Sequence, residues 1–207
     1  MKQTTTSPSA RDRILDTARR LFYRDGLRAT GIDRIIAESG VAKMSLYRHF
    51  PSKQHLIAAF LDWRHDYWMG WFTAAVEARW TKAPGLAVLA DVLGDWFAQD
   101  DFRGCAFINS VAETGPGDAS EPLQQALVHK QGLEAYIAEL AGRLELRAPE
   151  QVAQEAMLCV EGMIVRAQMR RDPQIVAAGR RLLARIEQDA RPDALRKRLR
   201  KRAPGAA

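Results

Sequence analysis

The chain has 207 residues and carries 31 Lys and Arg against 25 Asp and Glu, a formal net charge of +6. Its 2 cysteines, Cys105 and Cys159, are too few for a disulfide framework, so both are expected to be reduced thiols. The longest run without a charged residue, 67–76, is about half as long as a bilayer-crossing helix, and residues 1–11 lack the apolar core of a signal peptide. These features speak against a membrane-spanning or disulfide-stabilised protein and predict a cytoplasmic one.

Charge is distributed unevenly along the chain. Residues 1–60 hold 11 basic and 5 acidic residues, residues 61–190 hold 13 and 19, and residues 191–207 hold 7 and 1. A basic end joined to an acidic middle predicts one DNA-facing domain and a second domain with another role. We therefore expect a DNA-binding domain at 1–55, a helical domain at 56–190 and a basic tail at 191–207.

Helical periodicity dominates the chain, and no window alternates convincingly enough to predict a strand. Ser9 and Asp12 form a capping-box pattern that predicts a first helix ending near Gly26. Further helices are expected at about 32–39, 43–50, 53–78, 86–99, 105–113, 121–144, 149–171 and 173–190. The predicted fold is all-α, with a three-helix head and a larger helical body.

The region after the first helix contains two short helices joined by a glycine turn. Ile32 and Ile35 give the first of them an apolar face. Gly40 is expected to end that helix in the left-handed conformation, which glycine adopts without a Cβ penalty. Leu46 and Phe50, four residues apart, give the second helix a buried side. This layout is typical of a helix-turn-helix DNA-binding motif.

The outer face of the second short helix is basic, aromatic and hydroxylated. It consists of Lys43, Met44, Ser45, Tyr47, Arg48 and His49. Such side chains suit a major groove, where cations and hydroxyls meet phosphates and the leading residues of a helix reach base edges. Lys53 lies in the first turn of the next helix, a poor place for a cation unless an anion such as a DNA phosphate is near. A plain solvated surface is the alternative interpretation.

This region resembles the DNA-binding domain of the TetR family of bacterial transcriptional repressors. The matching positions, in register without a gap, are Phe22, Gly26, Thr30, Ile32, Ile35, Gly40, Val41, Leu46, Tyr47, Phe50, Pro51, Ser52, Lys53 and Leu56. So many positions in register make a specific signal. The resemblance implies a homodimeric repressor that binds double-stranded operator DNA and leaves it when a small-molecule effector binds.

The resemblance also implies roles for individual residues. The implied phosphate contacts are Thr30, Tyr47 and Lys53. The positions implied to select sequence are Lys43, Met44 and Ser45, and the implied DNA-backbone contacts are Arg48 and His49. Ala42 departs from the family, because a Ser or Thr usually caps the recognition helix there, a cap worth about 1 kcal/mol. Met44 replaces a usually small residue, and either packs on a thymine methyl or merely covers the helix end.

The helix expected at 53–78 has a wide apolar arc that is rich in aromatic residues. A helix that covers only its own core needs an apolar stripe of about 100°, so the surplus predicts a cavity lining or a partner surface. The candidate ligand contacts on this arc are Trp63, Arg64, Tyr67, Trp68 and Trp71. Two interpretations of Arg64 stay open. Either its stem packs against the rings while its charge reaches water, or it stacks on a ring or pairs with an acidic ligand group.

The helix expected from Pro149 carries a polar line at Gln154, Glu161 and Gln168. This line is a solvated edge, a polar row across a dimer interface or part of a ligand pocket, which makes Glu161 a further ligand candidate. The TetR resemblance implies that the two C-terminal helices pack against those of a second subunit as a four-helix bundle. Apolar surface for that contact is expected from Leu182, Leu183 and Ile186.

Cys105 is a redox candidate. It follows Arg103 near a predicted helix start, where a positive neighbour and the helix dipole favour a thiolate. The competing and more common interpretation is a small buried apolar residue.

Catalytic patterns are missing from the sequence. The four histidines show no HExxH spacing, and there is no phosphate loop, dinucleotide fingerprint or nucleophile elbow. We therefore expect no enzyme, cofactor or metal. The alternative to a DNA-binding regulator is a helical protein-interaction module without specific DNA readout. The basic cluster at 191–202 is expected to be a solvated extension or to add nonspecific DNA affinity.

Overall fold

The computed structural model describes residues 8–114 and 121–192 of the chain. Within these ranges the chain forms nine α-helices and no strand, which confirms the predicted all-α fold. No helix in the described ranges is long and apolar enough to cross a membrane. The predicted basic tail lies outside the described residues from residue 193 onward, as does most of the segment between the helices predicted at 105–113 and 121–144.

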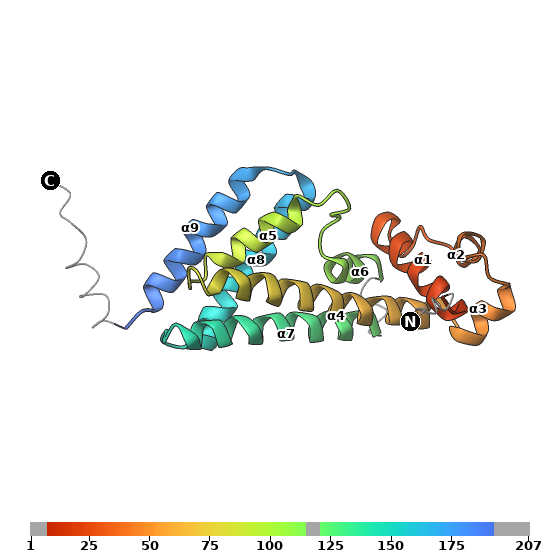
Figure 1. The fold of residues 1–207 in the computed structure, drawn as a ribbon, viewed down its shortest axis with the longest axis horizontal. Helices are drawn as coiled ribbons and strands as arrows, with labels where there is room; N and C mark the ends of the chain where they lie inside the picture. The colour runs from red at the N-terminus through yellow and green to blue at the C-terminus, as the bar shows by residue number, and fades with distance from the viewer. Residues whose placement is uncertain (1–7, 115–120, 193–207) are drawn as a thin grey trace, which may run out of the picture. The chain divides into compact units, whose positions relative to one another are not determined.

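The helices follow the expected order, and their ends differ from the predicted ones by at most two residues. The N-terminal helices are α1 (Ala10–Asp25), α2 (Ile32–Ser39), α3 (Lys43–His49) and α4 (Lys53–Trp80) (Figure 1). The later helices are α5 (Val88–Phe97), α6 (Ala106–Thr114), α7 (Glu121–Arg143), α8 (Pro149–Met169) and α9 (Pro173–Ala190).

The chain divides into two compact units. The first unit combines residues 1–67 with 105–129, and the second combines residues 68–104 with 130–207. Helices α4 and α7 each contribute to both units. The first unit is larger than the predicted head because α6 and the first turns of α4 and α7 belong to it. This packing does not test whether DNA binding is confined to residues 1–55.

The core of the first unit joins α1, α2 and α3 to the start of α4. Leu21, Ile35 and Leu46 are each 0 % exposed, and the rings of Phe22 and Phe60 lie 5.6 Å apart. Burying one such side chain stabilises the fold by about 1.5 to 3 kcal/mol. The two short helices therefore pack against α1 and against each other, and α1 in turn contacts α4.

Helix α1 begins at the predicted capping box. The hydroxyl of Ser9 accepts a hydrogen bond from the backbone N–H of Asp12 at 3.2 Å, and the Asp12 carboxylate accepts one from the Ser9 N–H at 3.3 Å. The hydrogen bond from the Ser9 hydroxyl lowers the pKa of the Asp12 carboxyl. Local side-chain chemistry thus sets the start of the first helix.

Helices α5, α8 and α9 pack together in the second unit (Figure 1). Leu93 on α5, Val160 on α8 and Leu183 on α9 are each 0 % exposed. The buried carboxylate of Glu187 on α9 accepts a 2.8 Å hydrogen bond from the backbone N–H of Leu86. That bond ties the segment before α5 to the last helix.

Candidate DNA-binding surface

A left-handed glycine sets the turn between α2 and α3. Gly40 has φ 63° and ψ 33°, and its N–H donates to the carbonyl of Ile36 at 3.2 Å. The guanidinium of Arg13 on α1 donates to the carbonyl of Gly40 at 3.4 Å. The predicted glycine turn is therefore confirmed, and it carries the chain directly into α3.

One side of α3 is buried and the other faces solvent. Leu46 is 0 % exposed and Phe50, at the end of the helix, is 3 % exposed. In contrast, Met44 is 75 % and Tyr47 40 % exposed. Ser45 is half-buried. The exposed residues of this helix and its cap, named the α3 outer face below, are Ala42, Lys43, Met44, Tyr47, Arg48 and His49.

Ala42 begins α3 without a side-chain cap, as its sequence position predicts. It is exposed, with φ −69° and ψ 144°, and its carbonyl accepts hydrogen bonds from the N–H groups of Ser45 and Leu46 at 2.9 and 3.2 Å. Because alanine has no polar side-chain atom, no side chain of residue 42 bonds to the first N–H groups of α3.

Lys43 is paired across the turn with an acidic residue of α2. Its ammonium lies 3.6 Å from the carboxylate of Asp33, and the two side chains are 64 % and 89 % exposed. Exposed ion pairs of this kind contribute little stability, so the ammonium is readily given up to a stronger anion. A DNA phosphate or a guanine edge is such an acceptor.

Lys53 starts α4 at the edge of this surface. Ser52 caps the helix, because its hydroxyl accepts a hydrogen bond from the N–H of His55 at 3.3 Å. The Lys53 side chain is half-buried. Burial lowers the pKa of its ammonium, and the carboxylate of Glu113 offsets part of that effect. An anion arriving from outside would favour the charged form further.

Thr30, an implied phosphate contact, has a side chain that is hydrogen-bonded within the first unit. Its side chain is 0 % exposed. Its hydroxyl donates to the carbonyl of Gly26 at 2.7 Å, and it lies 3.3 Å from the carbonyl of Leu21. This hydroxyl therefore closes the C-terminal end of α1 and is not available to a phosphate.

Helix α6 supplies a contact that the sequence does not reveal. The carboxylate of Glu113 accepts a 2.7 Å hydrogen bond from the backbone N–H of Arg28. Gly26 has φ 92°, and a Cβ at this position would lie 3.0 Å from a carboxylate oxygen of Glu113. No spacing rule links residues 85 positions apart, so only the folded chain brings them together.

Ion pairs surround α1 and α2 on the side away from the core. Asp25 is bonded by Arg24 at 2.7 Å and by Arg34 at 2.9 Å, and Glu38 is bonded by Arg20 and Arg34. The hydrogen bond from Arg24 lowers the pKa of the Asp25 carboxyl to about 2. The hydrogen bond from Arg20 lowers that of Glu38. The acidic groups near the motif are thus largely neutralised by their own neighbours.

The candidate ligand residues of the first unit stack on one another. Trp63 and Tyr67 are stacked with centroids 4.9 Å apart, and the guanidinium of Arg19 lies 3.9 Å from the Trp63 ring. Arg64 is 7 % exposed and lies 4.1 Å over the ring of Tyr23. Its charge does not reach water, so of the two interpretations the ring stack is the one observed.

The candidate ligand residues of the second unit belong to a different cluster. Trp68 stacks on Phe72 at 4.6 Å, meets Trp96 at 5.3 Å and lies 6.4 Å from Trp71. Glu161 is paired with Lys130 on α7 at 3.1 Å. Neither of two hollows described in the second unit is lined by any of the predicted ligand residues. Their ligand role stays a prediction.

Two histidines meet in the first unit, a contact that sequence reasoning missed. The Nδ1 atoms of His65 on α4 and His129 on α7 lie 3.1 Å apart, and His129 stacks on Phe107 at 3.9 Å. In the described part of the chain, no group of three or more His, Cys, Asp and Glu side chains is arranged to hold a metal ion.

Both cysteines are buried free thiols in the structure. Cys105, the redox candidate, is 5 % exposed. The guanidinium of Arg103 donates to the carbonyls of Asp100 and Phe102 at 3.1 and 2.8 Å. Burial raises the pKa of the Cys159 thiol. Redox sensing by Cys105 stays a prediction, one that needs local opening before an oxidant can reach the sulfur.

Comparison with known proteins places this surface in a family. Residues 14–60 match the family described as bacterial regulatory proteins, tetR family. The HTH-type transcriptional regulator LmrA of Bacillus subtilis is 32 % identical over 159 residues, 75 % of this chain and 82 % of that protein. The HTH-type transcriptional repressor ComR of Escherichia coli is 25 % identical over 141 residues, which cover 66 % of this chain and 67 % of ComR.

The fold is shared along most of the chain. A crystal structure of a TetR-family transcriptional regulator from Streptomyces coelicolor superposes with a TM-score of 0.75 at 29 % identity, covering 87 % of this chain and 95 % of that one. The likeness therefore extends beyond the motif into the helical body. The chain belongs to the TetR family of bacterial transcriptional regulators, DNA-binding proteins that are not enzymes.

Proposed function

We propose that this regulator is a homodimeric repressor that binds operator DNA through the α3 outer face and leaves it when a small-molecule effector binds. The observation that best supports this proposal is that α3 has one buried side, at Leu46, and one exposed side, which includes Met44 and Tyr47. A seven-residue helix held from one side offers its whole opposite side to a groove. Lys43, Met44 and Ser45 face the bases, and Tyr47, Arg48, His49 and Lys53 hold the DNA backbone.

Dimerisation supplies a second three-helix head that binds DNA. Operators read by helix-turn-helix dimers place their half-sites about one helical turn, roughly 34 to 36 Å, apart. Two copies of the α3 outer face then enter successive major grooves of a partly palindromic site. A monomer would contact only half of it and bind with much lower affinity.

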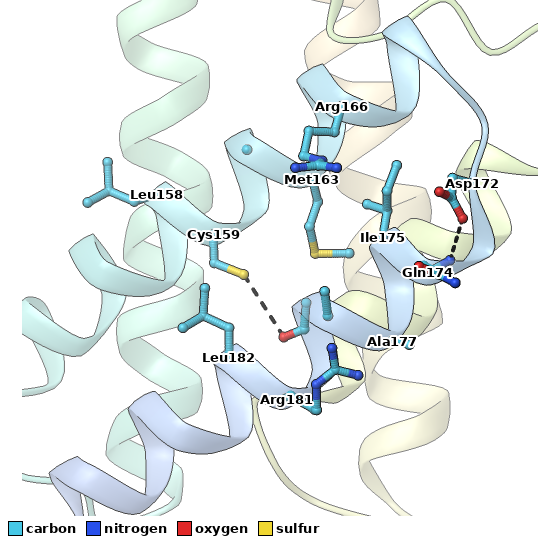
Figure 2. A pocket seen from close by; sticks show the side chains of 13 residues that line it. Leu158, Cys159, Met163, Arg166, Asp172, Gln174, Ile175, Ala177, Arg181 and Leu182 are labelled. Atoms are coloured by element: carbon cyan, nitrogen blue, oxygen red, sulfur yellow. Dashed lines mark hydrogen bonds between the residues drawn. The ribbon is translucent and has the colours of Figure 1, made fainter.

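The proposed dimer contact is the exposed apolar surface of α8 and α9. Residues of α8 and α9 line a hollow of about 690 Å³. They include Leu158 and Met163 on α8 and Leu182 on α9 (Figure 2). Leu158 is 75 % and Leu182 49 % exposed. Exposed apolar side chains grouped around a hollow are typical of a protein interface. Leu183 contributes to the chain's own core instead, since it is 0 % exposed.

The proposed effector site uses the aromatic residues of α4. Each unit offers its own candidates: in the first unit Tyr67 is 56 % exposed, and in the second unit Trp71 is half-buried beside Trp68. Rings that are partly covered by the chain offer an aromatic or apolar effector a surface to stack on. Release follows if the effector binds more tightly to a dimer whose heads are wrongly spaced for DNA.

A reporter assay tests the regulatory direction. The gene's own upstream region is placed before a reporter in a bacterial host, with and without the full-length protein. The repressor proposal predicts lower expression with the wild-type protein and recovery when the α3 outer face is altered by Tyr47→Ala. Higher expression with the protein would show an activator. An unchanged reporter, with no DNA bound in vitro, would favour a protein-interaction module.

A further inference from the structure

The leading end of α3 presents an apolar side chain to solvent. Met44 is 75 % exposed, whereas Leu46, two residues later, is 0 % exposed. Residues two apart on an α-helix point about 200° apart, so Met44 points away from the core that Leu46 enters. Among the large apolar side chains described in the first unit, Met44 is the most exposed. Single exposed apolar side chains are common on protein surfaces, so what distinguishes Met44 is its position at the leading end of α3, the end that reaches base edges in a helix-turn-helix motif.

The neighbours of Met44 in the first turn are charged, half-buried or short. The ammonium of Lys43 lies 3.6 Å from the carboxylate of Asp33, so it begins from a partnered state. Ser45 is half-buried. Ala42 adds only a methyl group at the N-cap. The thioether of Met44 is therefore the long first-turn side chain that reaches outward without an ion pair to break.

We infer that Met44 contacts the C5-methyl group of a thymine at one position of each operator half-site. This inference rests on the proposed entry of the α3 outer face into the major groove. The thymine methyl is the apolar group that base pairs display in that groove, and the other base-edge groups there are hydrogen-bond donors and acceptors. A flexible, polarisable thioether packs on a methyl group and offers nothing to a donor or acceptor.

Deoxyuridine tests this contact because it differs from thymidine only by the missing methyl group. The full-length protein first selects operators from a random DNA library, and each recurring thymine is then replaced singly by deoxyuridine. Removing one buried methyl-sized group corresponds to about a fourfold loss of affinity per half-site. We expect that loss at one symmetric position, and a much smaller loss at the same position for Met44→Ala.

Controls separate the methyl contact from general effects. Val128→Ala removes an exposed apolar side chain, 59 % exposed, from α7 and is expected to keep full sensitivity to deoxyuridine. Met44→Leu keeps an apolar side chain and most of the sensitivity.

Three results contradict the inference or its basis. Equal binding of thymine and uracil operators at every position by the wild-type protein overturns the methyl contact. So does undiminished uracil sensitivity in Met44→Ala, which would place the contact on another residue. If the selection enriches no sequence at all, the proposed DNA readout itself fails.

Discussion

The carboxylate of Glu113 in the last turn of α6 accepts a 2.7 Å hydrogen bond from the backbone N–H of Arg28, in the turn between α1 and α2. The same carboxylate lies against Gly26 and partly offsets the lowered pKa of the Lys53 ammonium. One half-buried carboxylate of α6 therefore contacts the turn that leads into the helix-turn-helix and acts on a proposed phosphate contact.

Removing this carboxylate is expected to weaken both stability and DNA binding. Glu113→Ala loses the hydrogen bond to Arg28, which corresponds to about 1 kcal/mol of unfolding free energy. It also leaves the half-buried ammonium of Lys53 without its nearby anion. Urea denaturation measures the first effect, and fluorescence anisotropy with operator DNA measures the second. Asp66→Ala removes an exposed carboxylate from α4 in the same unit and serves as the control. Equal stability of the two variants would contradict the role of Glu113.

The two glycines of the motif are expected to differ in their tolerance of alanine. Gly26 has φ 92° and ψ 162°, and its Cβ would press on Glu113 at 3.0 Å, whereas Gly40 has φ 63° and ψ 33° and its Cβ would meet only Arg13 at 3.9 Å. Strain at Gly26 predicts a cost of about 1 to 3 kcal/mol, and Gly40→Ala is expected to cost about 1 kcal/mol. The denaturant midpoints of the two variants show which substitution lowers stability more. A smaller loss for Gly26→Ala would show that Glu113 moves aside freely.

The ionised carboxylate of Asp25 is expected to stabilise the fold, and this contribution should be lost in acid. Its pKa falls from an ordinary 3.8 to about 2 because Arg24 and Arg34 stabilise the carboxylate. A lowered carboxyl pKa contributes stability that is complete above about pH 3.8 and disappears as the pH falls toward 2. The difference in Tm between the wild-type protein and Asp25→Asn should therefore be largest above pH 4 and shrink as the pH falls through about 2. Because these groups lie at the surface, added salt should shrink it. A difference that grows toward pH 2 would contradict this assignment.

The proposed dimer predicts that a charge on α9 separates the subunits. Leu182→Glu places a carboxylate at the edge of the hollow between α8 and α9 and is expected to give monomers with little operator affinity. Sedimentation velocity measures the mass, and circular dichroism checks the fold. Leu127→Glu alters a leucine of similar exposure on α7, 45 % against 49 %, and should remain a dimer. A Leu182→Glu protein that is still dimeric would show that the dimer interface lies elsewhere.

Features set by neighbours in the sequence were predictable. The capping box at Ser9, the left-handed Gly40 and the missing cap at Ala42 all appear where expected, because each depends on residues within one helical turn. The helix bounds follow for the same reason, since the 3.6-residue period is a local signal. The assignment to the TetR family rests on the same local positions.

Features set by distant contacts were not predictable. Thr30 occupies a family position, yet its hydroxyl bonds to the backbone at Gly26 because the end of α1 leaves carbonyls to satisfy. Arg64 was expected near ligand or water, but α1 places the ring of Tyr23 over it. The Glu113 contact joins α6 to the turn before α2. Sequence periodicity gives the face on which a residue lies but not what covers that face.

A titration with DNA shows whether the α3 outer face and the start of α4 form the DNA-binding surface. Fluorescence anisotropy compares the wild-type protein, Tyr47→Ala/Lys53→Ala, and the control Val128→Ala/Lys82→Ala, which alters two exposed residues, on DNA from the gene's upstream region and on unrelated DNA of equal length. Losing two phosphate contacts is expected to lower affinity at least about tenfold without loss of helicity. If these residues hold the DNA, the wild-type and control proteins bind the upstream DNA tightly and preferentially, and Tyr47→Ala/Lys53→Ala loses that binding. Undiminished binding by that folded variant, or no preference of the wild-type protein for its upstream DNA, would contradict DNA binding by this surface.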